Sequence, residues 1–372
     1  MRIGIDARFY NESGVGRYLR NLIGNLKSID KKNEYYIFLL PRDFEGFKVS
    51  DNFQKIKADF SWYGLAEQLK FPKLLNKYDL DLVHFPHFNT PIFYKRKFVV
   101  TIHDLIHQHF RMAKSTTHDP IIYKIKQIGY QSVFKNAVKK SQRILVPSDY
   151  VLNLLIKEWG VENEKIVVTT EGVDKSIEEI NDKMNEKRQK EIIEKFNIHS
   201  PYIFYVGNAH PHKNVEGLIG AFLELRKKHK SLQLVLAGQD HYFWKRLKKE
   251  NQHEDIIYVG RVSDEELVAL YKKAQCFVMP SHEEGFGIPI LEAMVCSCPV
   301  VSSKSGSLGE VGGDAVIYFD SLDRMDIVSK IESVLDSKKI RLDLIKKGRQ
   351  RVKLFSWEKL AARTLGVYNQ CF

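Results

Sequence analysis

Short apolar blocks alternate with amphipathic stretches along the first half of the chain. The first block, Arg2–Asp6, is followed by Gly14–Leu26, where apolar residues recur three or four positions apart, as on one face of a helix. Further blocks rich in Val, Ile and Phe predict strands at Tyr35–Leu40, Leu82–Phe85, Phe98–His103, Arg143–Pro147 and Lys165–Thr169. This alternation is typical of a parallel sheet covered by helices.

The pattern restarts after Glu178–Lys195, an almost entirely polar segment that we expect to be a surface helix or a linker. Helices are predicted at Val215–Lys228, around Tyr242–Glu250 and at Asp264–Lys273. The last of these begins with a capping box formed by Ser263 and Glu266. Strands are predicted at Tyr202–Gly207, Leu232–Gly238, Ile256–Val259, Cys276–Pro280, Pro299–Ser302 and Ala315–Phe319.

Two such arrays in tandem within 372 residues predict an α/β protein with two Rossmann-like, doubly wound domains of parallel sheet. We place these domains at residues 1–173 and 174–355. Ligands of such sheets lie beyond the C-terminal ends of the strands, so we expect the two domains to face a central cleft that holds the site.

The composition, 44% hydrophobic and 28% charged, is that of a soluble globular protein. No apolar run approaches the ~18 residues of a membrane span. The N-terminal residues lack the apolar region of a signal peptide, and four cysteines are too few for a disulfide scaffold. We therefore expect a cytoplasmic protein.

The net charge is +12, and much of it lies in the segment 111–143, which has eight basic residues and one acidic residue. Such a segment attracts phosphate groups, and we expect contact with an anionic membrane surface or with a lipid-linked pyrophosphate. Its apolar residues also have helical spacing, so a helix with one face in the core and one in water explains the pattern equally well. The sequence leaves both interpretations open. No nucleic-acid recognition module is visible, so we expect no nucleic-acid partner.

Glycines near the start of the chain form the first motif that could bind a phosphate. Gly14 and Gly16 come between the first strand and the first helix, where backbone N–H groups and the helix N-terminus favour an anion. The motif falls short of the dinucleotide fingerprint, because Leu19 occupies the position of its third glycine. A tight turn that needs glycine is an equally good interpretation.

Two further candidates follow predicted strands. Lys213 lies in Gly207–Asn214, just before a predicted helix, where it could contact a diphosphate. His103 lies at the end of a predicted strand and could hydrogen-bond a sugar hydroxyl. Taken alone, Lys213 is better explained as an ordinary surface lysine and His103 as a structural histidine.

The most informative segment is Pro280–Met294, a loop with two glycines between a strand and a helix. Pro289 suits the first turn of that helix, so the backbone amides of 286–288 would face an incoming phosphate. Glu292 is expected in the first turn, where it could bind ribose hydroxyls, and Glu284 is expected in the loop, where it could reach a sugar.

These segments resemble the family-4 retaining glycosyltransferases of GT-B fold, and the resemblance runs nearly from end to end. Glu284 and Glu292, with seven residues between them, are similar to the family's E-x7-E motif and lie in the stretch EGFGIPILEAM. The stretch Val300–Phe319 is similar to the segment on the C-terminal side of that motif in the family. The stretches IGIDARFYNESGVGRYLRNLI, HFPHFNTPI and YVGNAHPHKN resemble mannosyltransferase-type members, which commonly use GDP-mannose to build surface polysaccharides.

The resemblance implies a donor-binding role for several residues. Gly14 and Gly16 would line the loop that faces the donor diphosphate, and Lys213 would contact it. Glu292 would hold the ribose, and Arg261 would lie near the base. Further donor contacts are expected at Asn208, His212, Phe286, Gly287 and Ile288. His212 stands where many members have Arg.

The resemblance also implies the catalytic residues, His103 near the anomeric carbon and Glu284 on the transferred sugar. Retention of configuration is likewise implied by the family. Our working hypothesis is a front-face route, in which the leaving diphosphate assists deprotonation of the acceptor. The last helix, about 356–372, would pack back onto the first domain. The resemblance further implies that residues 1–173 form the acceptor-side domain and that residues 174–355 bind the nucleotide sugar.

No metal or other cofactor is expected. Asp79-Leu80-Asp81 has the form of a metal-binding D-x-D, but it precedes a strand and is better explained as an acidic pair at the strand start. Lys213, the glycine loops and the helix N-termini can neutralise a diphosphate without a metal ion.

The sequence thus predicts an enzyme that moves a hexose from a nucleotide-sugar donor to a glycan or lipid-linked acceptor in surface polysaccharide biosynthesis. Mannose from GDP-mannose is the favoured donor. The expected location is the cytoplasm, or the inner face of the cell membrane if the basic segment contacts lipid. The alternatives are a UDP-sugar-dependent transferase of the same fold and a non-catalytic protein that binds nucleotide sugars.

Overall fold

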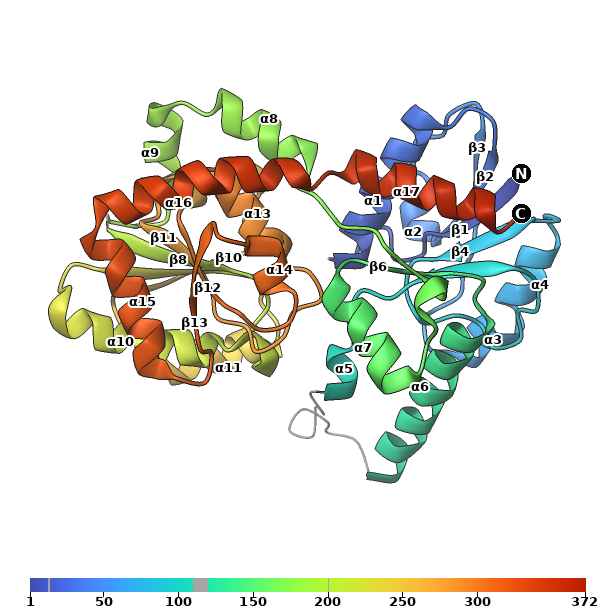
Figure 1. The fold of residues 1–372 in the computed structure, drawn as a ribbon, viewed down its shortest axis with the longest axis horizontal. Coiled ribbons are helices and arrows are strands. Elements are labelled where there is room, and N and C mark those ends of the chain that lie inside the picture. Colours follow the sequence, from blue (N-terminus) through green and yellow to red (C-terminus); the bar gives the residue numbers. More distant parts are fainter. Residues whose placement is uncertain (13, 110–119, 200) are drawn as a thin grey trace. The chain divides into compact units, whose positions relative to one another are not determined.

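The structure, a computed structural model, describes residues 1–12, 14–109, 120–199 and 201–372, with backbone only at 107 and 120–127. The chain forms two compact units (Figure 1). Unit 1 comprises Met1–Glu171 and Trp357–Phe372, and unit 2 comprises Gly172–Ser356. Each unit contains one parallel sheet covered by helices, which confirms the predicted α/β architecture with two Rossmann-like domains.

Unit 1 has a seven-stranded sheet of order β3-β2-β1-β4-β5-β6-β7. Its strands are β1 Arg2–Asp6, β2 Glu34–Leu39, β3 Phe53–Lys57, β4 Leu82–Phe85, β5 Phe98–Thr101, β6 Ile144–Val146 and β7 Ile166–Val168. The sequence pattern missed β3, because its residues FQKIK are mostly polar. This strand lies at the sheet edge and is half-exposed, so few of its side chains have to be apolar.

The helices of unit 1 connect and cover these strands. They are α1 Gly14–Ile29, α2 Pro41–Phe44, α3 Leu65–Leu69, α4 Phe71–Asn76, α5 Ile106–His109, α6 Pro120–Lys140, α7 Asp149–Trp159 and α17 Trp357–Gln370. The helix predicted at Gly14–Leu26 is confirmed and continues to Ile29. Leu19, Leu22 and Leu26 are fully buried, as the helical spacing predicted.

Unit 2 has a six-stranded sheet of order β10-β9-β8-β11-β12-β13. Its strands are β8 Tyr202–Val206, β9 Gln233–Ala237, β10 Ile256–Gly260, β11 Cys276–Met279, β12 Val300–Ser303 and β13 Val316–Phe319. All six were predicted to within two residues at each end. Short runs of Val, Ile, Leu and Phe identify them, since a parallel strand is buried on both faces.

The helices of unit 2 are α8 Lys175–Lys183, α9 Glu186–Lys195, α10 Val215–Lys228, α11 Tyr242–Glu250, α12 Asp264–Lys273, α13 Ile288–Val295, α14 Leu308–Gly312, α15 Arg324–Asp336 and α16 Lys338–Arg351. The predicted capping box of α12 is present, with Ser263 and Glu266 bonded reciprocally. The polar segment Glu178–Lys195 forms parts of two helices. They are separated where Asn185 accepts a hydrogen bond from the Arg188 N–H and begins α9.

Both sheets reverse their strand order at one point. In unit 1 the order runs outward from β1 in one direction and from β4 in the other, and in unit 2 the corresponding pair is β8 and β11. The connections on the two sides of such a switch point run to opposite faces of the sheet, which leaves a crevice at the carboxyl ends of the central strands. The loops after β1, β4, β8 and β11 are therefore the expected ligand-binding segments.

The C-terminal helix α17 packs against α1 in unit 1 (Figure 1). A buried polar chain joins it to the sheet. The Tyr368 hydroxyl lies 2.6 Å from Nδ1 of His84, and Nε2 of His84 lies 2.8 Å from the Thr101 hydroxyl. That hydroxyl lies 3.0 Å from the hydroxyl of Tyr18 on α1.

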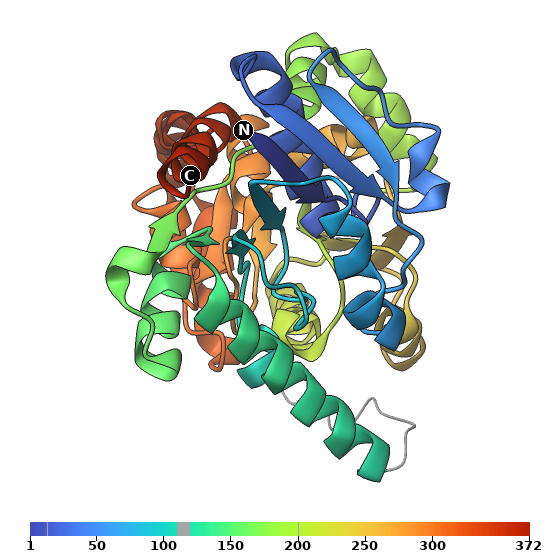
Figure 2. The same ribbon diagram turned by 90° about the vertical axis from the view of Figure 1, so that its right-hand side faces the viewer.

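Part of the basic segment 111–143 lies outside the described residues. Its remainder forms α6, whose N-terminal end extends away from the sheet of unit 1 (Figure 2). Phe134, Ala137 and Val138 are buried, and Lys135 and Lys139 are exposed, so the C-terminal part of α6 has one face in the core and one in water. No helix in the described part of the chain is long and apolar enough to cross a membrane.

We predict that His84 makes unit 1 sensitive to acid. Burial, together with the nearby His103, lowers the pKa of His84 from 6.5 to about 3. At a pH between these two values the unfolded chain protonates His84 and the folded chain does not. Because protonation favours the unfolded chain, the free energy of unfolding is unaffected by His84 above pH 6.5 and decreases as the pH falls below it. The melting temperature at pH 4 should therefore drop on the order of 5–10 °C further in the wild type than in His84→Gln. Exposed His241→Gln is the control, and equal pH slopes for the wild type and His84→Gln would contradict the prediction.

Candidate functional site

Two loops meet at the switch point of unit 2. The loop after β8, Gly207–Asn214, ends at Asn214, whose Nδ2 donates to the carbonyl oxygens of Pro280 (3.1 Å) and Ser321 (2.9 Å). The His282 N–H donates to the carbonyl oxygen of His212 at 2.7 Å. These bonds fasten the loop after β8 to the loop after β11, so that functional side chains 71 residues apart come together.

An ion pair between Lys213 and Glu284 lies where these loops meet. Nζ of Lys213 is 2.7 Å from both carboxylate oxygens of Glu284, and the Ser281 hydroxyl donates to Oε1 at 2.6 Å. The side chains are only 15% and 8% exposed, so their attraction is screened less than that of a surface pair. An ammonium group has three N–H donors, so Lys213 keeps one for a further acceptor.

The backbone of the Glu284 loop is held from the segment after β12. The Ser307 hydroxyl donates to the carbonyl oxygens of Glu284 (3.0 Å) and Phe286 (2.8 Å), and the Ser307 N–H donates to that of Glu284. Gly306 has φ +63°, and a Cβ there would lie 2.5 Å from the Glu284 carbonyl oxygen. Only glycine therefore fits this position.

Helix α13 begins directly after this loop. Gly287, with φ +105°, precedes its first residue Ile288, and Pro289 lies in the first turn as predicted. The Phe286 side chain is buried against Phe355, which leaves its backbone to shape the loop.

The structure corrects the expected position of Glu292, which lies beyond the first turn of α13 and is 2% exposed. Tyr271 donates a hydrogen bond to its Oε2 at 3.2 Å. The helix begins at Ile288, one residue before Pro289, so Glu292 is its fifth residue and falls just beyond the first turn.

The other predicted residues of unit 2 are spread along the same sheet edge. The Asn208 carbonyl oxygen accepts from the Tyr205 hydroxyl at 2.7 Å, which stabilises the start of the loop after β8. The His212 ring stacks on that of His210 with centroids 5.8 Å apart. Arg261 is exposed at the end of β10, two strands from β8.

Three predicted residues belong to unit 1. Gly14 and Gly16 begin α1; a Cβ at Gly16 would lie 2.7 Å from the Tyr10 carbonyl oxygen, whereas Gly14 has open space. His103 lies two residues beyond β5, which ends at Thr101. Its Nε2 donates to the Pro86 carbonyl oxygen at 3.0 Å, and its Nδ1 lies 3.3 Å from Oε1 of Glu171. Both nitrogens therefore already have protein partners.

The sequence pattern did not identify Ser281, Gly306, Ser307 and Tyr271 as members of the site. Each acts on a residue that was identified, either by a hydrogen bond or by close backbone packing. Gly306 and Ser307 lie in the stretch Val300–Phe319, whose resemblance to the family was the only available signal.

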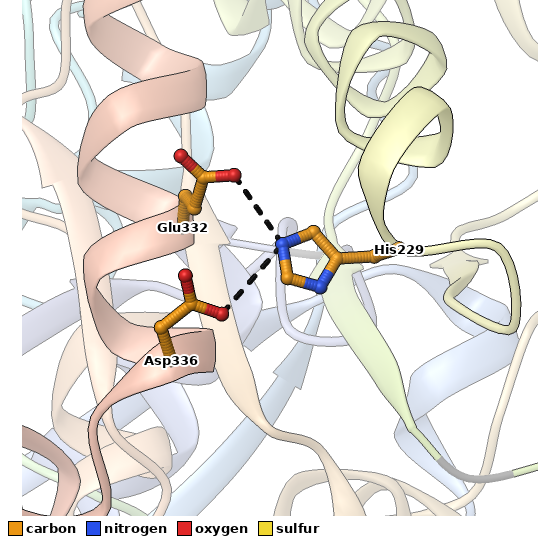
Figure 3. Close-up of side chains that lie close together, drawn as sticks. All are labelled: His229, Glu332 and Asp336. Atoms are coloured by element: carbon orange, nitrogen blue, oxygen red, sulfur yellow. Dashed lines mark ion pairs between the residues drawn. The ribbon is translucent and has the colours of Figure 1, made fainter.

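One group of described residues has its side chains spaced as metal ligands would be, and it lies elsewhere in unit 2 (Figure 3). Nε2 of His229 lies 3.4 Å from Glu332 and 3.8 Å from Asp336, and the Lys228 ammonium group lies 3.1 and 3.2 Å from the same carboxylates. Lys228 thus already balances their charge. The group lies at the C-terminal end of α10, about 20 Å from the end that carries Lys213.

The four cysteines are free and buried. Burial raises the pKa of Cys276 and of Cys296 to about 12, so both remain thiols at neutral pH. Such residues act as small apolar side chains of the core.

We predict that Gly306→Ala loosens the Glu284 loop. The new Cβ would collide with the Glu284 carbonyl oxygen and would also have to adopt φ +63°. We expect a loss of about 1–3 kcal/mol in stability and faster exchange of the Ser307 amide hydrogen. Gly160→Ala is the matched control, because Gly160 has φ +61° and open space around it. A loss of stability no larger than that of Gly160→Ala would show that the close packing at Gly306 is unimportant.

Comparisons with known proteins identify the family of the chain. A family model described as Glycosyltransferase Family 4 matches residues 13–176, and one described as Glycosyl transferases group 1 matches residues 186–351. The chain is 28% identical to the O-antigen chain mannosyltransferase B of Escherichia coli, over 97% of both chains. It is also 28% identical to the MMP alpha-(1->4)-mannosyltransferase of Mycolicibacterium hassiacum, over 65% of this chain and 57% of the relative.

The fold is similar to that of solved glycosyltransferase structures. The sucrose-phosphate synthase of Thermosynechococcus elongatus superposes with a TM-score of 0.78 at 20% identity, over 100% of this chain and 98% of the other. The two family models together span both units, and the mannosyltransferase relatives extend across them. The chain therefore belongs to the family-4 glycosyltransferases of GT-B fold and is mannosyltransferase-like.

Proposed function

We propose that this glycosyltransferase transfers mannose from GDP-mannose to a glycan or lipid-linked acceptor, with retention of configuration and without a metal ion. The observation that carries the proposal is the largely buried Lys213–Glu284 ion pair at the switch point of unit 2. The similarity to an O-antigen chain mannosyltransferase supports the choice of mannose and of an acceptor in surface polysaccharide biosynthesis.

The donor diphosphate would bind where the loops after β8 and β11 meet. Lys213 has an N–H donor to offer, and the N-termini of α10 and α13 add partial positive charge. A phosphate oxygen would draw the Lys213 ammonium group away from Glu284. These groups supply the positive charge that a metal ion would otherwise provide, which supports metal independence.

Glu284 would then be available to the transferred sugar. Its carboxylate keeps the Ser281 hydroxyl as a hydrogen-bond donor, and its backbone is held by Ser307, so its position is set before the donor binds. A carboxylate fixed in this way can stabilise the positive charge that develops at the anomeric carbon.

The proposed reaction uses one face of the sugar. The bond from the anomeric carbon to the diphosphate oxygen breaks, and the acceptor oxygen bonds to the same face while its proton passes to the leaving diphosphate. We assign His103 to a hydrogen bond with the reacting sugar. Both ring nitrogens of His103 have protein partners, so a sugar hydroxyl has to replace one of them.

A lipid-linked acceptor would bring the enzyme to the inner face of a membrane, and the basic residues of 111–143 are the proposed contact with anionic lipid. The described part of α6 supports this only through its exposed lysines, Lys135, Lys139 and Lys140.

The first test measures donor choice and metal dependence together. In EDTA, GDP-mannose should raise the melting temperature more than other GDP- and UDP-sugars, and slow release of GDP should follow. Glu284→Gln and Lys213→Gln should reduce that release by about 10²–10³-fold, because each removes a charge that acts on the donor.

The matched control is Lys228→Gln, which removes a lysine with two carboxylate partners from the opposite end of α10. It should leave GDP release unchanged. Stabilisation by UDP-sugars alone would show that the donor is a UDP-sugar rather than GDP-mannose. Stabilisation without any release of the nucleoside diphosphate would favour a non-catalytic protein. Activity that EDTA abolishes and Mg²⁺ restores would contradict metal independence.

The second test measures stereochemistry. Proton NMR of the product should show the α-configuration of the mannose in GDP-mannose, since the front-face route keeps it. A β-linked product would contradict retention, and a trapped covalent glycosyl-enzyme would contradict the front-face route while leaving retention in place.

A further inference from the structure

The switch point of unit 1 carries a cluster of aromatic residues. Phe9 follows β1 and His87 follows β4, so both lie at the carboxyl ends of the two central strands. Trp62 stacks on Phe9 with ring centroids 4.4 Å apart and an interplanar angle of 17°. The His87 ring lies 5.3 Å from that of Phe9 and 6.5 Å from that of Tyr63. We call Phe9, Trp62, Tyr63 and His87 the aromatic platform.

The platform is only partly covered by protein. Phe9 is 8% exposed and forms its base, Trp62 and His87 are half-buried, and Tyr63 is 65% exposed. The indole N–H of Trp62 has no hydrogen-bond partner among the described residues, although a buried donor usually has one.

The loop that carries Trp62 and Tyr63 is held by a buried ionic network. Arg8 pairs with Asp6 and with Glu67 at 2.7 Å, and the three side chains are at most 2% exposed. Arg8 also donates to the carbonyl oxygen of Phe60 at 3.1 Å, and Glu67 accepts the Tyr63 N–H at 2.8 Å. The network therefore holds both ends of the segment 60–63.

The network holds Tyr63 in a backbone conformation that a bulky residue rarely adopts. Its φ is +61°, in the left-handed region that favours glycine. Burying three charged groups costs free energy, and so does this conformation. The result is an exposed aromatic ring in a fixed place, at the sheet edge where ligands of this fold bind.

We propose that the aromatic platform is an acceptor subsite, in which the ring of an acceptor sugar stacks on Trp62 and Tyr63. This inference rests on the proposed function, because it names the residues of unit 1 that would hold the acceptor of that reaction. A pyranose presents C–H bonds on one face, and these pack on the negative face of an aromatic ring. Its hydroxyl groups need polar partners at the rim.

A charged pair borders the platform. The Arg42 guanidinium lies over the Trp62 ring, 5.7 Å from its centroid, and pairs with Glu12 at 2.6 Å, and both side chains are about half exposed. An aromatic surface bordered by a few charged groups suits a sugar better than a lipid chain, which would leave those groups without partners.

The test uses Tyr63→Asn and Trp62→Leu in transfer from GDP-mannose, or from whichever donor is active, to methyl α-D-mannopyranoside and other methyl glycosides. Asn tolerates a positive φ, so Tyr63→Asn removes the ring without adding strain. We expect the KM for the acceptor to rise about tenfold in each variant. Release of the nucleotide diphosphate without acceptor should not change. Phe93→Asn is the control, since Phe93 is an aromatic residue of unit 1 that is 57% exposed.

A second measurement needs no donor. Saturation-transfer difference NMR should show contact between the wild type and the ring protons of a methyl glycoside, and Tyr63→Asn should weaken it. Unchanged KM and NMR signals would overturn the subsite, and so would the absence of contact with every glycoside. An effect confined to decyl glycosides would assign the platform to a lipid chain instead. If no sugar nucleotide stabilises the protein or is cleaved by it, that result contradicts the proposed function, and the NMR measurement still tests the platform.

Discussion

A parallel sheet whose strand order reverses near its centre is the constraint on which the rest of this structure depends. Each connection between two parallel strands crosses over one face of the sheet. The connections on the two sides of the reversal lie on opposite faces of the sheet. In unit 2 this brings together the loops after β8 and β11, and in unit 1 the loops after β1 and β4. Residues far apart in sequence, such as Lys213 and Glu284, become neighbours because adjacent strands end at the same edge.

The loops at the two switch points are held by different means. In unit 2 a lysine and a glutamate pair with each other, and Gly306 and Ser307 hold the loop backbone so closely that no side chain fits at 306. In unit 1 a buried arginine between two carboxylates holds a loop with the half-buried Trp62 and the exposed Tyr63. The first arrangement offers charge to a phosphorylated ligand, and the second offers a flat apolar surface with polar groups at its rim. A donor and an acceptor of a sugar-transfer reaction differ in the same way.

Much of this polar framework also stabilises the fold. Tyr368 on the last helix reaches His84 in the middle of the unit 1 sheet, and Glu292 is bonded to Tyr271 within unit 2. A buried polar group needs a partner, so loss of either member costs stability as well as geometry. Substitutions at such residues affect folding and function together, whereas Tyr63 is exposed enough to act on a ligand directly.

The sequence by itself determined most of the elements and indicated the loops after β8 and β11 as the candidate site. Apolar runs identified every strand except β3, because a strand buried on both faces must be apolar and an edge strand need not be. The motif around Glu284 and the glycines near it indicated a phosphate-binding loop, since such loops need particular residues at fixed spacing. Only the tertiary structure decided which side chains meet. It placed Glu292 beyond the first turn, brought Gly306 against Glu284, and joined Asp6, Arg8 and Glu67 in one network. These contacts join residues up to 59 positions apart, and sheet register and crossover geometry set them rather than any local pattern.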